Sequence, residues 1–306
     1  MTYPSIKETH YPALHKRRVV FVVPHGAGSN DFLRHFPELP ADPQLQNVWP
    51  LFLSYLEIER DAGATEIAHA AAAKLAAHYA ITALVVELNY PRGLVDGGRL
   101  RDHALRHCLP EPLATGLQKK MLDVHETSLL YMDRLYESMA HDHASFLIDV
   151  HTMASFCPVD ATGQKKTFPV SFDRLQEYID QYLHAHRYRC QRKIDLICSD
   201  EQGRKLADTM LLATLTDSLR EASYEYLENE PYHAAPMYLS YQHMQKVPSI
   251  SLDVPKHLVM FGNAADHVLD QLKIDPAAID RLAATLARGI ANAFARKPFF
   301  KRPDHP

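Results

Sequence analysis

The chain has 306 residues, of which 46% are hydrophobic and 23% charged, close to globular averages, so a disordered or fibrous protein is excluded. Its formal net charge of −4 gives no reason to expect a nucleic acid or an anionic membrane as partner. No segment approaches the roughly 18 consecutive apolar residues of a membrane span. The N-terminus lacks a signal-peptide core, which favours a cytoplasmic location, and the four cysteines lack a Cys-x-x-Cys spacing and are expected to be reduced.

The first confident strand is predicted at residues 18–24, which are β-branched and apolar like a strand covered on both faces. Residues 1–17 before it carry two prolines and scattered charge and are expected to be irregular. His25 follows directly, at the carboxyl end of the strand, where open α/β sheets place their sites. The alternative is a glycine-rich turn that happens to contain a histidine.

A strongly helical alanine-rich segment is predicted at residues 67–79, and Asp61 lies just before it. The proline-rich residues 31–50 are expected to be mostly loop, with a short helix at residues 32–36. Asp61 either caps the helix or projects into a site, and the sequence does not separate the two readings.

A second strand is predicted at residues 81–88, and a glycine-rich loop with Arg92 and Arg99 follows it. Two guanidinium groups beyond a strand can form a carboxylate clamp, although solvated loop arginines are commoner. Residues 117–140 show the helical period. His125 on this helix either faces the site or is a histidine of the core or of the surface.

The strand predicted at residues 146–152 ends in Asp149-Val150-His151. Alternate residues of a strand point to the same face, so Asp149 and His151 lie together. His151 is a candidate metal ligand, and Asp149 is its candidate orienting neighbour. The alternative is a strand end that merely enters a polar loop.

Further elements complete an alternation of strands and helices. They are a polar loop at residues 158–167, a helix at about 172–186, a strand at 194–198, a helix at 203–221, an alternating strand within the stretch 249–256 and a closing helix at 277–296. This order predicts an α/β fold with a mixed, mainly parallel central sheet and helices on both faces. Asp253 ends the last strand, or merely begins a turn before Pro255. Because no linker is evident, we expect residues 1–306 to form one α/β domain with a core at about 18–296 and a basic, exposed tail after it.

Six short segments occur in an order that resembles the N-formylglutamate amidohydrolase family, over roughly residues 18–260. They are Val23-Pro24-His25-Gly26, Arg60-Asp61-Ala62-Gly63, the loop 91–99, the strand end 147–152, Asn229-Glu230-Pro231-Tyr232 and the strand end 250–256. This family is related in fold to the zinc carboxypeptidases and to the succinylglutamate desuccinylase and aspartoacylase enzymes. The resemblance therefore implies a zinc carboxypeptidase-like fold of the phosphorylase/hydrolase type.

The resemblance also implies zinc-dependent hydrolysis of a non-peptide C–N bond. The expected substrate is a small N-acyl amino acid, most specifically N-formylglutamate, which would give formate and glutamate and link the chain to amino-acid metabolism and histidine degradation. His25 and His151 match the family's zinc ligands, and we favour Asp61 as the carboxylate ligand. Glu59 and Asp31 are weaker candidates, because the His-x-x-Glu arrangement of the carboxypeptidases is absent. Three protein ligands would leave a position for water.

By the same resemblance, Asp253 matches the strand-end glutamate that serves as general base and acid. Arg99 matches the arginine that polarises the scissile carbonyl or holds the substrate carboxylate, and Arg92 the other loop arginine. Asn229 and Tyr232 are expected substrate contacts. The chain departs from the family in the shorter Asp253 and in a glycine at position 98, where the family has asparagine. A carboxypeptidase-like hydrolase of peptides and a non-catalytic ligand-binding protein are therefore kept as alternatives, and the oligomeric state is left open.

Overall fold

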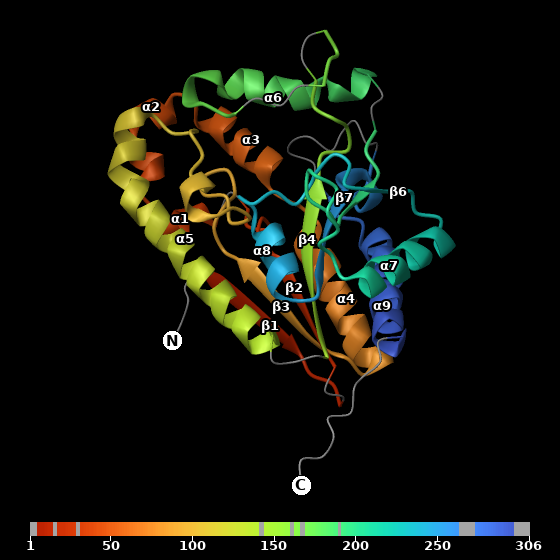
Figure 1. Ribbon diagram of the computed structural model, residues 1–306. Helices are drawn as coiled ribbons and strands as arrows, with labels where there is room; N and C mark the ends of the chain where they lie inside the picture. The colour runs from red at the N-terminus through yellow and green to blue at the C-terminus, as the bar shows by residue number, and fades with distance from the viewer. Residues whose placement is uncertain are drawn as a thin grey trace.

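The structure is a computed structural model, and a seven-stranded mixed sheet forms its centre (Figure 1). It describes residues 5–14, 17–28, 31–140, 144–159, 162–165, 169–188, 191–262 and 273–296. The strands are β1 (Ile6–Tyr11), β2 (Arg18–Val23), β3 (Thr82–Leu88), β4 (Ser145–Met153), β5 (Ile194–Ile197), β6 (Tyr226–Glu228) and β7 (Ser249–Pro255). The α-helices are α1 (Phe32–His35), α2 (Pro43–Gln46), α3 (Trp49–Glu59), α4 (Ala64–Tyr79), α5 (Glu111–Ala140), α6 (Leu175–Leu183), α7 (Thr209–Glu221), α8 (Leu239–Lys246) and α9 (Pro276–Arg296).

The order of the strands across the sheet is β1-β3-β2-β4-β7-β5-β6. Strands β3, β2, β4 and β7 are parallel to one another, whereas β1 pairs antiparallel with β3 and β5 pairs antiparallel with β7. The predicted α/β fold with a mixed, mainly parallel sheet is therefore confirmed. As a result, the carboxyl ends of β2, β4 and β7 and the amino end of β5 meet at one edge of the sheet.

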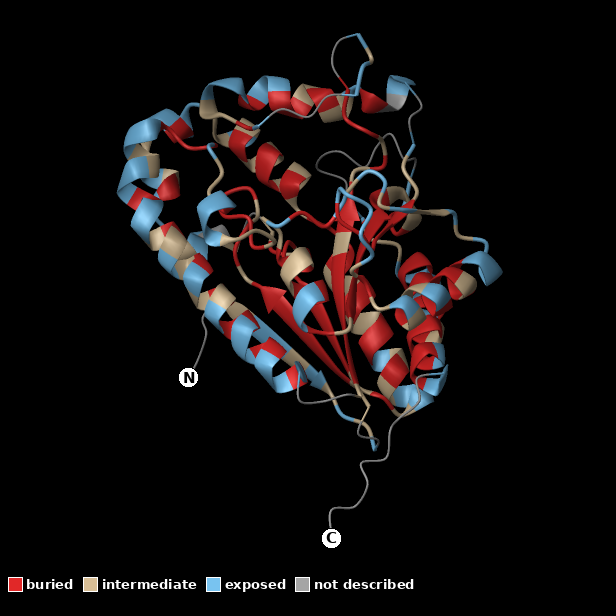
Figure 2. Cartoon of the chain, in the orientation of Figure 1, coloured by how far each residue is buried: buried red, intermediate tan, exposed pale blue. Residues whose placement is uncertain are grey.

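Helices cover both faces of the sheet because both faces of its central strands are apolar. On β2, Val19 and Phe21 pack with α4, α7 and α9, and the alternating Val20 and Val22 pack with α5. Figure 2 shows the central strands and the inner helix faces as buried. A further apolar cluster joins α3 and α6, with Tyr55 against Tyr178, and these helices lie beyond the carboxyl ends of the central strands (Figure 1).

Several predicted elements are confirmed, including the strands at 18–24, 81–88 and 146–152 and the short helix at 32–36. The prediction of an irregular entry was wrong, because residues 6–11 pair with β3 as an edge strand. The prediction of loop up to Pro50 missed α2 and the start of α3, and neither β6 nor α8 was predicted. The helix expected from residue 203 begins at Thr209, because the side chain of Asp208 accepts a hydrogen bond from Leu211 N and caps it.

Two further expectations concern the C-terminal tail and membrane-spanning segments. The tail after residue 296 lies outside the described residues. Within the described part of the chain, each helix is too short or too polar to cross a bilayer.

Candidate metal centre and active-site cleft

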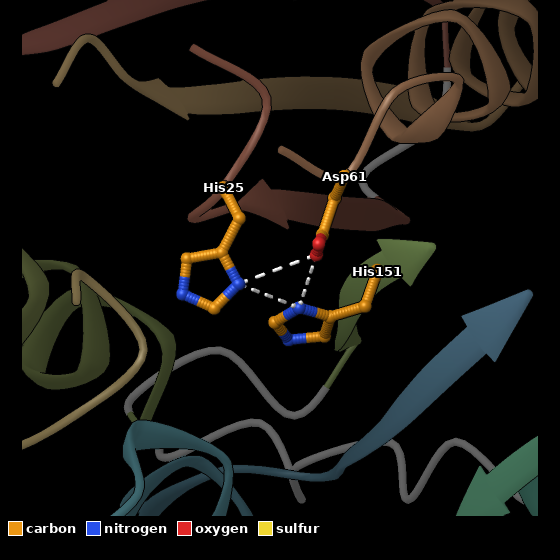
Figure 3. Close-up of side chains that lie close together, drawn as sticks. All are labelled: His25, Asp61 and His151. Carbon is orange, nitrogen blue, oxygen red and sulfur yellow. Dashed lines mark hydrogen bonds and ion pairs between the residues drawn. The ribbon is translucent and has the colours of Figure 1, made fainter. Parts of the chain in front are cut away.

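His25, Asp61 and His151 come together from three distant segments at the carboxyl edge of the sheet (Figure 3). His25 lies two residues beyond the end of β2, and His151 lies near the end of β4. Asp61 lies between α3 and α4, where its backbone N–H donates a 3.0 Å hydrogen bond to the carbonyl of His25. Gly63, with a positive φ of 98°, then turns the chain into α4. The side chain of Asp61 does not cap that helix and lies instead beside His25 and His151.

Three donor atoms of these residues converge on one point. Asp61 Oδ2 lies 2.9 Å from His151 Nδ1 and 3.2 Å from His25 Nδ1, and the two Nδ1 atoms are 3.1 Å apart. Ligands of a tetrahedral zinc ion at about 2.0–2.1 Å are separated from one another by about 3.3 Å. The observed spacing fits, so His25, Asp61 and His151 can hold a metal ion.

A buried carboxylate supports each histidine from behind. His25 Nε2 lies 2.8 Å from Asp96 Oδ1, and His151 Nε2 lies 3.2 Å from Asp149 Oδ2. A proton on each Nε2 can therefore be donated to a carboxylate, which leaves the Nδ1 lone pair directed at the shared point. Metal-binding histidines are held by this kind of support. The predicted proximity of Asp149 to His151 is thus observed.

The buried charges of the site shift one another's protonation. Burial would raise the pKa of Asp61, but His25, His151 and Arg92 hold it below its ordinary value. Burial would likewise lower the pKa of His151, but the carboxylates of Asp149 and Asp61 raise it well above its ordinary value. The carboxylate of Asp61 therefore stays ionised and available as a metal ligand or as a partner of the histidines.

The two loop arginines are engaged by carboxylates of the protein. Arg99 Nε lies 2.9 Å from Asp96 Oδ2. Arg92 lies 3.5 Å from Asp61 Oδ1, and its Nε lies 3.6 Å from both Glu59 Oε2 and Asp96 Oδ2. Arg106, which the sequence did not single out, lies 3.0 Å from Glu59 Oε2. The loop after β3 thus forms an ion-pair network beneath the three converging side chains.

The weaker candidates for the carboxylate ligand lie elsewhere. Glu59 pairs with Arg106 and accepts a hydrogen bond from the hydroxyl of Tyr178. The side chain of Asp31 accepts a 2.8 Å hydrogen bond from Gly28 N. Neither belongs to the group of converging donor atoms, which leaves Asp61 as the carboxylate that the structure brings to the two histidines.

Asp253 stands beside His151 on the neighbouring strand. The Cα atoms of the two residues are partners in the parallel register of β4 and β7. Asp253 is 7% exposed, its Oδ1 has no hydrogen-bond partner among the described residues, and burial raises its pKa to about 7. A carboxylate with these properties can accept a proton near neutral pH.

The predicted substrate contacts have different surroundings. His25, Asp61 and His151 line a cleft, and Tyr232 lines the same cleft. The hydroxyl of Tyr232 accepts a 3.3 Å hydrogen bond from Arg192 Nη1. Asn229 uses its side-chain oxygen to accept hydrogen bonds from Cys198 N and Ser199 N, at 2.9 Å and 2.8 Å. Asn229 therefore shapes the turn that carries Tyr232 and does not line the cleft itself.

His125 and Gly98 hold the arginine loop in place. The buried ring of His125 donates from Nε2 to the carbonyl of Arg99 at 2.9 Å, so this histidine lies behind the loop. The N–H of Gly98 donates to Asp96 Oδ1 at 3.1 Å. A Cβ at position 98 would lie 2.9 Å from the ring of His25, so a larger residue there would require the ring or the loop to shift.

Sequence reasoning missed several residues of the cleft. They are Asp96, Tyr178, Tyr182, Arg192 and Lys256. Asp96 follows Arg92 by four residues and precedes Arg99 by three, and this spacing was the signal that could have identified the ion pairs. Tyr178 and Tyr182 come from α6, and nothing local in the sequence indicates that this helix covers the cleft.

Comparisons with known proteins identify the fold. No protein-family model matches the sequence, and a search of curated proteins found no match. Among solved structures, the gene product Atu2144 from Agrobacterium tumefaciens aligns with 14% identity and a TM-score of 0.55, over 94% of each chain. N-formylglutamate amidohydrolase from Ralstonia eutropha JMP134 aligns with 14% identity and a TM-score of 0.55, over 94% of this chain and 98% of its own. The expected resemblance in fold to an N-formylglutamate amidohydrolase is confirmed.

Proposed function

We propose that the chain is a zinc-dependent amidohydrolase that cleaves the amide of an N-acylated amino acid, most specifically N-formylglutamate. The observation that carries this proposal is the convergence of His25, Asp61 and His151 beside the unpaired carboxylate of Asp253. The fold shared with a structure described as N-formylglutamate amidohydrolase supports the same reaction class. The products, formate and glutamate, would connect the chain to amino-acid degradation, including that of histidine.

The metal ligands in this proposal are His25, Asp61 and His151. A zinc ion bound there supplies Lewis acidity that makes water acidic enough to react near neutral pH. Asp96 and Asp149 keep the two imidazole rings in place with Nδ1 directed at the metal. These five side chains thus determine where in the cleft hydrolysis takes place.

Asp253 is the proposed general base and acid. Its Oδ1 takes a proton from the attacking water, and the same proton passes to the nitrogen of the leaving amine when the C–N bond breaks. Arg99, whose side chain is 25% exposed and paired with Asp96, is the proposed group that polarises the carbonyl oxygen. Tyr232, in the wall of the cleft, contacts the substrate.

The first test measures metal content and activity together. Purified protein should carry zinc at one equivalent per chain by elemental analysis and should release glutamate from N-formylglutamate. His151→Ala should lose both the zinc and the hydrolysis. A wild-type protein without stoichiometric zinc, together with unchanged activity in His151→Ala, would falsify the proposal.

The second test separates catalysis from mere binding. Asp253→Asn should keep its zinc and bind substrate, but its kcat should fall by about 10²- to 10⁴-fold because the proton acceptor is lost. Assays with N-formyl amino acids and with short peptides run in parallel. Turnover of the peptides alone would point to a carboxypeptidase-like hydrolase, and unchanged kcat in Asp253→Asn would remove this residue from the mechanism.

A further inference from the structure

The charged side chains that line the cleft fall into a paired and an unpaired group. Glu59, Asp61, Arg92, Asp96 and Asp149 each have an ion-pair partner within the protein. Across the described ranges, the structure gives no ion pair for Asp253, Arg192 or Lys256. Asp253 already has a role as the proposed base, so the remaining unpaired charges of the cleft are two cations.

Lys256 is a buried cation. It follows β7, three residues after Asp253, it is 3% exposed, and it lines the cleft. An ammonium group carries three hydrogen-bond donors and is costly to bury without acceptors. Within the residues that the structure describes, no acceptor for its Nζ is found. Because Lys256 lines the cleft, its ammonium group is available to a molecule that binds there.

Arg192 approaches the cleft from the amino end of β5, on the far side of Asp253 from His151. The direct contacts of its guanidinium are with neutral groups: Nη1 donates to the Tyr232 hydroxyl at 3.3 Å, the Cys157 thiol is close, and the group lies 5.5 Å from the Tyr232 ring centroid. The carboxylates of Asp253 and Asp195 act on Arg192 only at longer range. Its Nε is buried, and no hydrogen-bond partner for it is present in the described part of the chain. A guanidinium fork with neutral neighbours can bind a carboxylate through two hydrogen bonds.

We propose that Arg192 and Lys256, rather than Arg92 and Arg99, bind the carboxylate groups of the substrate. This inference rests on the proposed function, since an N-acyl amino acid carries one carboxylate on its α-carbon and N-formylglutamate carries a second on its side chain. Arg92 and Arg99 already face Asp96, and a substrate carboxylate there would have to compete with a buried protein carboxylate. Neither Arg192 nor Lys256 has an ion pair within the described part of the chain, so a substrate carboxylate displaces none there. The nearest protein carboxylates, such as Asp253 and Asp61, act on them only at longer range.

The test compares carboxylate substrates with their neutral amides. Wild type should prefer N-formyl-L-glutamate to N-formyl-L-glutamine, which lacks the side-chain carboxylate, and to N-formyl-L-isoglutamine, which lacks the α-carboxylate. Arg192→Gln and Lys256→Met should each abolish the preference for one carboxylate. Each variant should lose about 100-fold in kcat/KM toward N-formylglutamate, mainly through KM, and little toward the matching amide. A variant that keeps both wild-type preferences overturns the assignment of its residue.

Two control variants each remove a positive charge outside the cleft. Arg220 is an exposed arginine that, like Arg192, donates to a tyrosine hydroxyl, that of Tyr226 at 2.9 Å. Lys246 is a half-exposed lysine paired with Asp133 on the surface. Arg220→Gln and Lys246→Met should keep the wild-type preferences, because neither residue lines the cleft.

Stability separates a binding role for Lys256 from a structural one. A buried ammonium without acceptors destabilises the free protein, so Lys256→Met should unfold at the same temperature as wild type or at a higher one, despite weaker substrate binding. A lower unfolding temperature with unchanged substrate preference would show a structural role and overturn the assignment. Lys256→Arg, which keeps the charge, should recover part of the affinity.

The two proposals fail in different ways. Hydrolysis by wild type, with unchanged preferences in both variants, leaves the proposed function intact and refutes the carboxylate sites. If wild type hydrolyses no N-acyl amino acid, the proposed function fails, and calorimetric titration with N-formyl-L-glutamate still decides the inference. Binding by wild type that weakens in Arg192→Gln and Lys256→Met supports it, and equal affinities or no binding overturn it.

Discussion

Gly98 sets how closely the arginine loop approaches His25. Its N–H donates to Asp96, and a Cβ there would lie 2.9 Å from the imidazole ring. We therefore predict that Gly98→Asn weakens zinc binding by about 10-fold or more because it displaces His25 from its supporting carboxylate. Competition with a chromophoric chelator measures the affinity. Gly116→Asn, at a helical glycine with open space around it, is the control, and unchanged zinc affinity in Gly98→Asn would refute the argument.

At the residue scale, the sequence identified the side chains that terminate apolar strands. His25, His151 and Asp253 could be found because each follows or ends such a strand, and Asp61 because it precedes a helix. The ion pairs behind them could not be found in the same way. Asp96 pairs with a histidine 71 positions away, and such partners are set by the packing of distant segments.

At the scale of elements, β1 is held by a small polar network. Glu87 on β3 accepts from Lys7 Nζ at 2.7 Å and lies 3.1 Å from His69 Nε2, while Tyr11 OH lies 2.8 Å from His69 Nδ1. Burial would raise the pKa of Glu87, but His69 and Lys7 lower it to about 2. This network ties the edge strand to β3 and to α4.

We predict that Glu87→Gln lowers the free energy of unfolding at pH 7 by about 1–2 kcal/mol, a value reduced for the exposure of Lys7. Because the folded pKa is depressed, the carboxylate stabilises fully above its unfolded pKa of about 4.3. This stabilisation is lost as the pH falls toward 2, so the difference between wild type and variant should shrink between pH 5 and pH 2. Urea unfolding at pH 7 and pH 3 measures it. Glu38→Gln, which removes an exposed pair with Lys120, should cost far less, and an equal cost would contradict the prediction.

The predictability of the elements follows from their burial. Strands β2 and β4 are buried on both faces and read as continuous apolar runs. Strand β1 is an edge strand with the sequence IKETHY and lacks such a run, so only its partner β3 identifies it. The three-residue β6 and the eight-residue α8 are too short for a periodic signal.

At the scale of the whole molecule, the proposed zinc ligands depend on the complete fold, because they lie at positions 25, 61 and 151. An unfolded chain has no preformed site, so zinc should bind the folded state preferentially. At a free zinc concentration about 1,000 times Kd, the free energy of unfolding should rise by about 4 kcal/mol. Differential scanning calorimetry with and without chelator measures the shift. His25→Ala should show no shift, and an equal shift in this variant would place the bound zinc elsewhere.

The position of β7 in the sheet has a consequence for synthesis of the chain. β7 lies between β4 and β5, yet residues 249–255 are made about a hundred residues after the strand that carries His151. Until then β4 has β2 on one side and an open edge on the other, and open edges invite association with other chains. That edge is therefore covered only after residue 255 has been translated. Asp253 also reaches its position beside His151 only then. A chain that ends before β7 therefore lacks both the strand that covers this edge of β4 and the proposed base beside His151.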